Sequence, residues 1–129
     1  HTPGQRRPEH IHLRAEKGEI RIPVFSLPVF GARFYYYTAA GKDIKFFLLR
    51  SPDAGIRAAF DACSACYRAK LGYRYEDGFM VCNNCGMTFR PGDIGLAAGG
   101  CNPIPLPNFV SGKTVVIKAS DLMKGACYF

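Results

Sequence analysis

Two C-x-x-C brackets lie close together in the middle of the chain, within the stretch DACSACYRAKLGYRYEDGFMVCNNCG. Cys63 and Cys66 form the first bracket, Cys82 and Cys85 form the second bracket, and fifteen residues separate them. Each bracket lets one short turn direct two sulfurs toward one point, and two such turns complete a tetrahedron of thiolates around a metal. The separation falls within the range of about 15–20 residues that is typical of four-cysteine zinc sites. The sequence therefore predicts a four-cysteine metal centre.

The identity of the metal stays open at this level. Thiolates are soft ligands that bind zinc, copper(I) and iron–sulfur centres alike, so both an iron–sulfur cluster and a zinc ion fit. Gly86 directly follows the second bracket, where a metal-binding turn needs a backbone without a Cβ so that the amide can approach a sulfur. Two alternatives remain for the same cysteines, namely redox-active dithiols and disulfides that stabilise an exported fold.

Three further residue groups are candidates around this centre. Cys101 and Cys127 complete an even count of six cysteines, so they form either a disulfide worth about 2–4 kcal/mol or, for Cys101, an extra ligand. Asp61, beside the first bracket, is interpreted as a turn cap rather than as a support for the ligands. A second metal site for copper or zinc is predicted at three histidines near the start of the chain, with a solvated arm as the alternative: His1, His10 and His12.

The pattern of apolar residues predicts a mainly β protein, a small β-sandwich or barrel-like domain. Residues 1–17 are expected to form an N-terminal arm and residues 18–129 a single β-rich metal-binding domain. The clearest hairpin joins the apolar runs 34–37 and 44–49 across a loop that contains Gly41. A second, smaller hairpin is predicted with its turn at Asp77 and Gly78. Residues 56–60 are predicted as a short strand before the first bracket, with a helix as the alternative.

Further along the chain, residues 92–107 contain too many glycines and prolines for regular structure, so a long loop is expected there. Residues 113–119 then predict a closing strand with Val115 and Ile117 on one face.

The net charge limits the range of possible binding partners. The chain has 129 residues and a net charge of +7, and its basic residues form no recognisable nucleic-acid-binding helix or stacking motif. We therefore expect no nucleic acid partner. The basic residues are expected to form a solvated face, which could also attract an acidic protein or a membrane surface. The chain starts with His1, which is expected if an export signal has been removed, so the predicted location is periplasmic or extracellular.

Several stretches resemble a known family. AAFDACSACY, MVCNNCGMTF and above all GGCNPIPLP resemble the FtrD-like domain of bacterial membrane-associated iron–sulfur proteins, over most of residues 18–127. The resemblance implies an exported or membrane-attached metal-binding domain connected with iron transport and electron delivery. The resemblance also marks the four bracket cysteines as the metal ligands. It implies that Cys101 belongs to the same signature. The chain has no apolar run near the ~20 residues that a membrane helix needs.

A looser resemblance concerns the fold. MVCNNCGMTFRPGDIG followed by PIPLPNFVSGKTVVIKA is similar to the cluster-binding half of Rieske proteins, in which two loops on a β-scaffold hold the cluster. Rieske centres use two histidines on one iron, whereas this chain has cysteines at both sites, so a genuine Rieske centre is excluded. The resemblance implies a Rieske-like or zinc-ribbon-like subregion with two facing cysteine loops.

No pattern for nucleophilic catalysis or phosphate binding is present, so we expect a noncatalytic domain. The leading hypothesis is an exported four-cysteine domain that transfers electrons or handles metal for a redox or transport partner. One alternative is a thiol–disulfide oxidoreductase that uses one bracket as its active pair. Another is a structural subunit that self-assembles outside the cell, for which the run FYYY at residues 34–37 would provide exposed aromatic surface.

Overall fold

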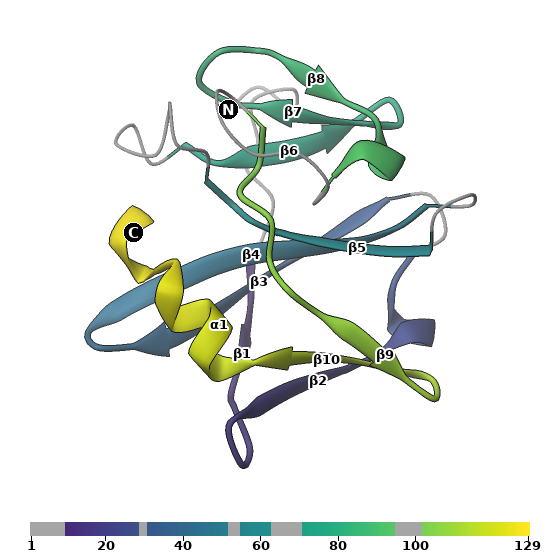
Figure 1. Ribbon diagram of the computed structural model, residues 1–129. Coiled ribbons are helices and arrows are strands. Elements are labelled where there is room, and N and C mark those ends of the chain that lie inside the picture. Colours follow the sequence, from purple (N-terminus) through teal and green to yellow (C-terminus); the bar gives the residue numbers. More distant parts are fainter. Residues whose placement is uncertain (1–9, 29–30, 52–54, 63–70, 95–101) are drawn as a thin grey trace.

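The computed structural model describes residues 10–28, 31–51, 55–62, 71–94 and 102–129. Within them the protein is mainly β, as the sequence predicts, and its strands form three sheets (Figure 1). The central sheet has the order β1-β3-β4-β5. Its strands are β1 (His10–Leu13), β3 (Ala32–Ala39), β4 (Lys42–Ser51) and β5 (Gly55–Phe60).

Two three-stranded sheets complete the fold. The lower sheet in Figure 1 comprises β2 (Glu19–Pro23), β10 (Thr114–Lys118) and β9 (Phe109–Ser111), in the order β2-β10-β9. The upper sheet comprises β6 (Tyr73–Glu76), β7 (Phe79–Cys82) and β8 (Thr88–Phe89). The helical elements are η2 (Val24–Ser26), η4 (Pro91–Asp93), α1 (Ala119–Lys124) and η5 (Ala126–Tyr128). No helix in the described part of the chain has the length and apolar character that crossing a bilayer requires.

Strand β4 explains why the molecule has three layers. Its side chains alternate between the two faces of the central sheet, and from Phe46 to Leu49 both sets are fully buried. Phe46 and its neighbours at alternate positions pack against the lower sheet, whereas Phe47 and Leu49 pack against the upper sheet. A strand that is covered on both faces needs a continuous apolar run instead of simple alternation. The predicted sandwich or barrel did not include this third, smaller sheet.

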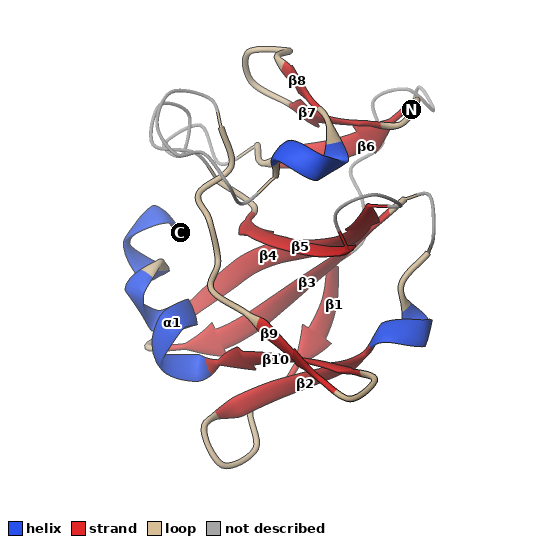
Figure 2. Ribbon diagram, turned by 45° about the vertical axis from the view of Figure 1, so that its right-hand side comes forward, coloured by secondary structure: helices blue, strands red, loops and turns tan. Residues whose placement is uncertain are grey.

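Each core contains residues that are distant in the sequence. In the lower core, Ile20 of β2, Val115 and Ile117 of β10 and Leu122 of α1 join the lower face of β4. In the upper core, Tyr73, Met80, Cys82, Phe89 and Ile94 pack against Phe34, Phe47, Leu49 and Ala59. The cysteine-bearing upper sheet lies above the central sheet (Figure 2). Packed apolar and aromatic side chains hold the two sheets together.

The predicted hairpins are present, and their turns have the expected chemistry. Ala40 and Gly41 join β3 to β4 with φ of 53° and 75°, and Asp77 and Gly78 join β6 to β7 with φ of 50° and 85°. Positive φ at both turn residues gives the twist that two-residue hairpins require, which explains a glycine at the second position. Residues 56–60 form part of strand β5 and not a helix, because β5 pairs with β4 along its whole length.

Two sequence-based expectations change in the structure. Residues 10–13 of the predicted arm form β1, which pairs in parallel with β3 so that His10 lies opposite Phe34. The run FYYY is not an exposed aromatic surface. Phe34 and Tyr35 are buried and Tyr36 is half-buried, because β3 lies inside the central sheet between β1 and β4. The division between arm and domain at residue 17 stays a prediction.

Candidate metal centre

Both cysteines of the first bracket fall within residues 63–70, which lie outside the described residues. The described residues on either side are joined by one buried side chain, and we call them the neck: Asp61, Ala62, Leu71, Gly72 and Tyr73. Oδ1 of Asp61 accepts a hydrogen bond from the backbone amide of Tyr73 over 2.7 Å, and Asp61 is only 6% exposed. The carboxylate thus joins the end of β5 to the start of β6 across the neck.

Residue 72 has to be glycine because the carboxylate of Asp61 lies against its backbone. Its φ is +65°, and a Cβ at this position would stand 2.7 Å from Oδ1 of Asp61. Both the left-handed backbone and the close approach of the carboxylate exclude a larger residue without rearrangement. The described backbone partner of Asp61 lies twelve residues further along the chain. The turn cap that the sequence indicated stays a prediction, because the residues that directly follow Ala62 lie outside the described residues.

The second bracket occupies the connection between β7 and β8. Cys82 ends β7 and is 1% exposed, whereas Cys85 lies in the exposed turn that follows. The amide of Cys82 donates to the carbonyl oxygen of Met87 over 2.9 Å, and the amide of Gly86 donates to the carbonyl oxygen of Cys82 over 2.8 Å. Gly86 has a φ of +79°, so the need for glycine is as predicted. Its amide closes the turn by donating to an oxygen, and the expected approach of this amide to a sulfur stays a prediction.

Asn83, between the two cysteines of the second bracket, connects this bracket to the neck. Its backbone amide donates to the carbonyl oxygen of Gly72 over 2.9 Å, and its Nδ2 donates to the carbonyl oxygen of Leu71 over 2.8 Å. Its Oδ1 accepts a hydrogen bond from Arg74 over 2.7 Å. In the β6–β7 ladder, Tyr73 lies opposite Cys82. The second bracket is therefore fixed directly beside the neck.

The segment that follows Cys101 also returns to the neck. The amide of Ile104 donates to the carbonyl oxygen of Ala62 over 3.0 Å, and the amide of Phe60 donates to the carbonyl oxygen of Ile104 over 2.8 Å. Pro105 forms an isolated bridge with Ala59. The described residues that border the cysteine-bearing segments thus meet at one end of β5 and β6 (Figure 1).

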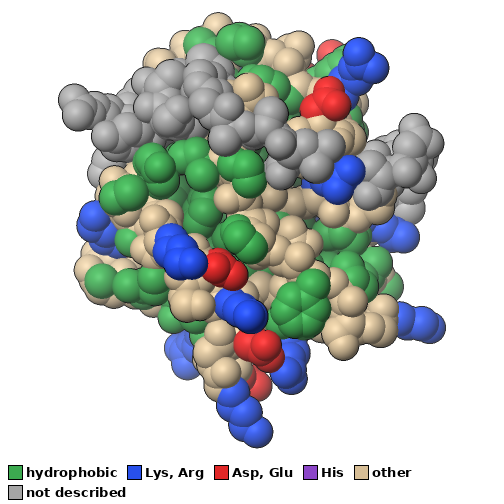
Figure 3. Space-filling view, in the orientation of Figure 1, with side chains coloured by type: hydrophobic (Ala, Val, Ile, Leu, Met, Phe, Trp, Pro, Cys, Tyr) green, Lys and Arg blue, Asp and Glu red, His purple; other side chains and the backbone are tan. Residues whose placement is uncertain are grey.

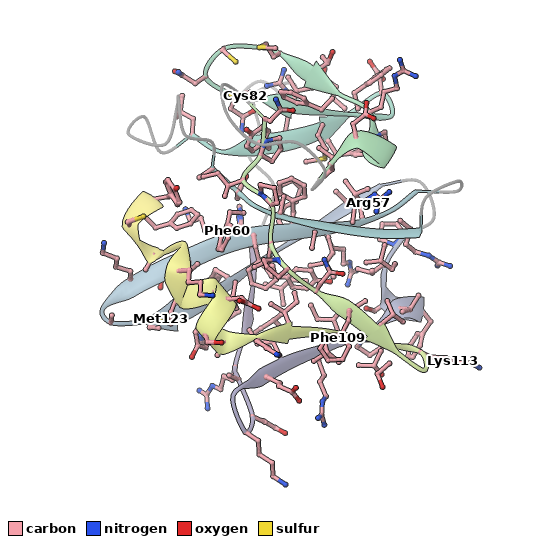
Figure 4. The ribbon with its side chains drawn as sticks, viewed as in Figure 1. Arg57, Phe60, Cys82, Phe109, Lys113 and Met123 are labelled. Carbon is pink, nitrogen blue, oxygen red and sulfur yellow. The ribbon has the colours of Figure 1, made fainter. Side chains whose placement is uncertain are left out.

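Cys127 lies in η5, on the C-terminal turn that packs against the same end of β5. The ring of Phe129 lies 6.5 Å from the ring of Phe60, and Nζ of Lys42 donates to the carbonyl oxygen of Ala126 over 3.2 Å. Gly125 contacts the ring of Phe60 so closely that it has no room for a Cβ. Figure 4 labels Phe60 on the central sheet and Cys82 on the sheet above it. Cys127 is exposed.

The remaining predicted ligands divide between described and undescribed residues. Cys63, Cys66, Cys101 and His1 lie outside the described residues, so the four-thiolate centre and the Cys101–Cys127 disulfide stay predictions. Across residues 10–28, 31–51, 55–62, 71–94 and 102–129, no group of three or more His, Cys, Asp or Glu side chains is placed to hold a metal ion. The chemistry of the bracket cysteines nevertheless fits a thiophilic group, since thiolates are the ligands that iron–sulfur clusters and structural zinc use.

The two described histidines point to the same side of β1, as their spacing predicts, but they have different surroundings. Nε2 of His10 lies 2.7 Å from Oδ2 of Asp61, and its ring contacts the edge of Phe34. His12 is exposed, and its ring stacks on Tyr36 with the centroids 4.7 Å apart. Their joint role in a second metal site with His1 stays a prediction.

Two sets of interactions at this site were not anticipated from the sequence, the pair of His10 with Asp61 and the bonds of Asn83. The pairing of His10 with Asp61 joins residues 51 positions apart, so no local pattern indicates it. For Asn83 the sequence held one signal, its position inside a C-x-x-C turn. Asparagine side chains in turns often bond to nearby backbone groups, so a bond from Asn83 to the backbone could have been predicted.

Charge on the molecular surface is mixed. Arg74 is paired with Glu76 over 2.7 Å, and Arg21 with Glu19 over 2.8 Å. On the face shown in Figure 3, Lys and Arg side chains are interspersed with Asp and Glu and do not form one continuous patch. This distribution on the visible face agrees with the interpretation of a solvated basic surface.

One known family matches the chain. Its description is "Membrane iron-sulfur containing protein FtrD-like", and the match covers residues 30–129, which include the neck and all six cysteines. No curated protein and no solved structure matches the chain. The likeness to Rieske proteins and to zinc ribbons therefore stays a prediction from the sequence.

Proposed function

The chain belongs to the FtrD-like family of membrane iron–sulfur containing proteins, and on this premise we propose that it is an exported electron-transfer or metal-handling domain. Its centre is held by Cys63, Cys66, Cys82 and Cys85, and it serves a redox or transport partner connected with iron uptake. The family description favours an iron–sulfur cluster over zinc as the bound group.

The observation that carries the proposal is the attachment of the second bracket to the neck of the first. Asn83 bonds to Leu71 and Gly72, which directly follow residues 63–70 with the first bracket. Asp61, two residues before Cys63, bonds to Tyr73 opposite Cys82. A four-cysteine centre requires two C-x-x-C turns to approach each other, and these bonds bring together the backbone from which both turns start.

The different exposure of the second-bracket cysteines supports electron transfer. Cys82 is buried in the upper core beside Tyr73 and Phe89, whereas Cys85 lies in the exposed turn. A cluster held between them would have a shielded side and a side near the surface. Burial, hydrogen bonding and nearby charge set the reduction potential of such a centre, and the exposed side provides a short path for the electron to a partner.

Membrane association is part of the proposal through the family description. A net charge of +7 would favour an anionic membrane surface or an acidic partner protein. These attractions act over about 8–10 Å at physiological salt, so they would orient the domain during an encounter without a large hydrophobic interface.

Spectroscopy of the intact protein tests the proposal. We expect protein purified without oxygen to contain iron and acid-labile sulfide, to absorb in the visible range and to lose this absorption on reduction. Single replacements of Cys63, Cys66, Cys82 or Cys85 by serine should abolish the chromophore. Cys127→Ser is the matched control, because Cys127 is a described cysteine outside the brackets, and it should retain the chromophore.

Other outcomes would identify the alternatives. Colourless protein with one equivalent of zinc would identify a structural four-thiolate site. Protein without bound metal, in which one bracket is alkylated only after reduction, would identify a thiol–disulfide oxidoreductase. For the second bracket, the described structure speaks against this last activity. Thioredoxin-like pairs precede a helix, whereas this bracket is followed by strand β8.

A further inference from the structure

His10 reaches the neck from a different part of the fold. Strand β1 lies beside β3 in the central sheet, 51 residues before Asp61 in the sequence, and its pairing with β3 directs the ring of His10 onto Phe34. From there Nε2 lies 2.7 Å from Oδ2 of Asp61, and the two side chains are 16% and 4% exposed. An ionised carboxylate only accepts hydrogen bonds, so His10 is the donor in this pair.

The two oxygens of Asp61 thus have separate tasks. Oδ1 accepts from the amide of Tyr73 and joins the two sides of the neck, while Oδ2 faces His10. The carboxylate also packs tightly against Gly72, so it has little freedom to rotate. Without His10, a nearly buried carboxylate oxygen would lose this donor, and the carboxylate would gain by turning toward water. Such a turn would weaken its bond to Tyr73.

We propose that His10 is a positioning residue of the cysteine centre, which acts by holding the carboxylate of Asp61 across the neck. This inference rests on the proposed function. Cys63 is two residues beyond Asp61 in the chain, and Tyr73 lies opposite Cys82. The pair therefore constrains the relative position of the backbone before the first bracket and the backbone beside the second. Groups that support metal ligands in this way typically change metal affinity by about 10–100-fold when they are removed.

Three substitutions separate the hydrogen bond from the packing of the ring. His10→Phe keeps an aromatic ring against Phe34 but has no donor, and His10→Gln keeps a donor but has no ring. His12→Phe is the matched control, because His12 is on the same face of the same strand and stacks on Tyr36. The probe is Co²⁺ added to the reduced, metal-free full chain, and both affinity and geometry are read from the thiolate-to-cobalt absorption bands. Co²⁺ held by histidines alone gives no such bands, so the predicted histidine site does not enter this comparison.

We expect His10→Phe to bind Co²⁺ about 10–100-fold more weakly than the unaltered protein and to shift the thiolate bands. His10→Gln should recover most of the affinity and the original bands, and His12→Phe should match the unaltered protein in both. The bands of the cobalt-loaded form are the decisive readout, since a general loss of stability would leave the spectrum of the loaded form unchanged.

The inference is overturned if His10→Phe binds Co²⁺ with unchanged affinity and bands, or if His12→Phe shows an equal loss. It is also overturned if His10→Gln, while folded by circular dichroism, behaves like His10→Phe. Absence of thiolate bands in the unaltered protein overturns the proposed function, and this inference with it. Normal bands in the unaltered protein with no effect of His10→Phe overturn this inference alone.

Discussion

Nδ2 of Asn83 donates a hydrogen bond to the carbonyl oxygen of Leu71 over 2.8 Å. This bond connects the second bracket to the first described residue after residues 63–70, which include the first bracket. Asn83 also accepts from Arg74 on its Oδ1, so its side chain is held from two sides. The resulting link is part-buried.

Replacement of Asn83 by alanine should weaken metal binding. Asn83→Ala removes both side-chain hydrogen bonds and leaves the carbonyl oxygen of Leu71 without this donor, which should lower the free energy of unfolding by about 1–2 kcal/mol. We expect the affinity for Co²⁺ to fall by at least about tenfold, measured by competition with a chelator. Asn84→Ala is the control, because Asn84 is the exposed neighbour inside the same bracket. Equal effects of the two substitutions would contradict the proposed link.

Gly72 should tolerate no side chain. Gly72→Ala would place a Cβ 2.7 Å from the carboxylate of Asp61 and would strain a backbone with φ of +65°. We expect a loss of about 2–4 kcal/mol in the free energy of unfolding, measured by denaturant titration.

Gly78→Ala provides the comparison for Gly72. Gly78 has a similar left-handed backbone, with φ of +85°, but no atom would lie within 4 Å of its Cβ. Only the backbone strain of about 1–2 kcal/mol is expected there. If the two substitutions cost the same, the close packing of Asp61 against Gly72 contributes nothing.

Substitutions on the two faces of β4 should distinguish effects on stability from effects on metal binding. Phe46→Leu and Phe47→Leu each remove part of a fully buried ring, so both should cost about 1–2 kcal/mol in unfolding free energy. Phe47 packs against the upper core with Tyr73 and Cys82, whereas Phe46 packs in the lower core. Only Phe47→Leu should therefore weaken Co²⁺ binding. Weaker binding in Phe46→Leu to the same degree would indicate that metal affinity follows global stability.

Tyr35 should make stability depend on alkaline pH. Burial raises the pKa of its hydroxyl above 10.0, although Arg33 and Ser26 nearby partly oppose this effect. Among the described residues, no side chain makes a hydrogen bond of acceptable geometry with this hydroxyl. The folded protein therefore disfavours the phenolate. Its contribution to stability is complete below pH 10 and declines as the pH rises through the raised pKa.

Tyr35→Phe tests this prediction. The substitution removes a buried hydroxyl that lacks a good partner, so stability near neutral pH should be unchanged or higher by up to about 1 kcal/mol. Unfolding titrations between neutral pH and about pH 11 should show a smaller alkaline loss in the variant than in the unaltered protein. A marked loss of stability at neutral pH would indicate that the hydroxyl has an important partner.

Local features of the fold were predictable because they depend on neighbours in the sequence. The turns Ala40–Gly41 and Asp77–Gly78 and the strands beside them follow from short-range patterns of glycine and apolar residues. The third sheet was not predictable from the same patterns. It depends on Phe47 and Leu49 finding partners in β6 and β7, and the continuous apolar run of β4 is compatible with several arrangements of covering layers.

The sequence by itself determined which thiols are available to a metal, because the spacing of four cysteines and the glycine after the last of them are local features of the chain. Only the tertiary structure decided what lies beside the second bracket and at the neck. Asp61 bonds to Tyr73 and His10, and Asn83 bonds to Leu71, through contacts between segments that are distant in the chain. Such contacts depend on how three sheets pack, and a directional hydrogen bond of 2.7 Å exists only after that packing has set the position of both partners.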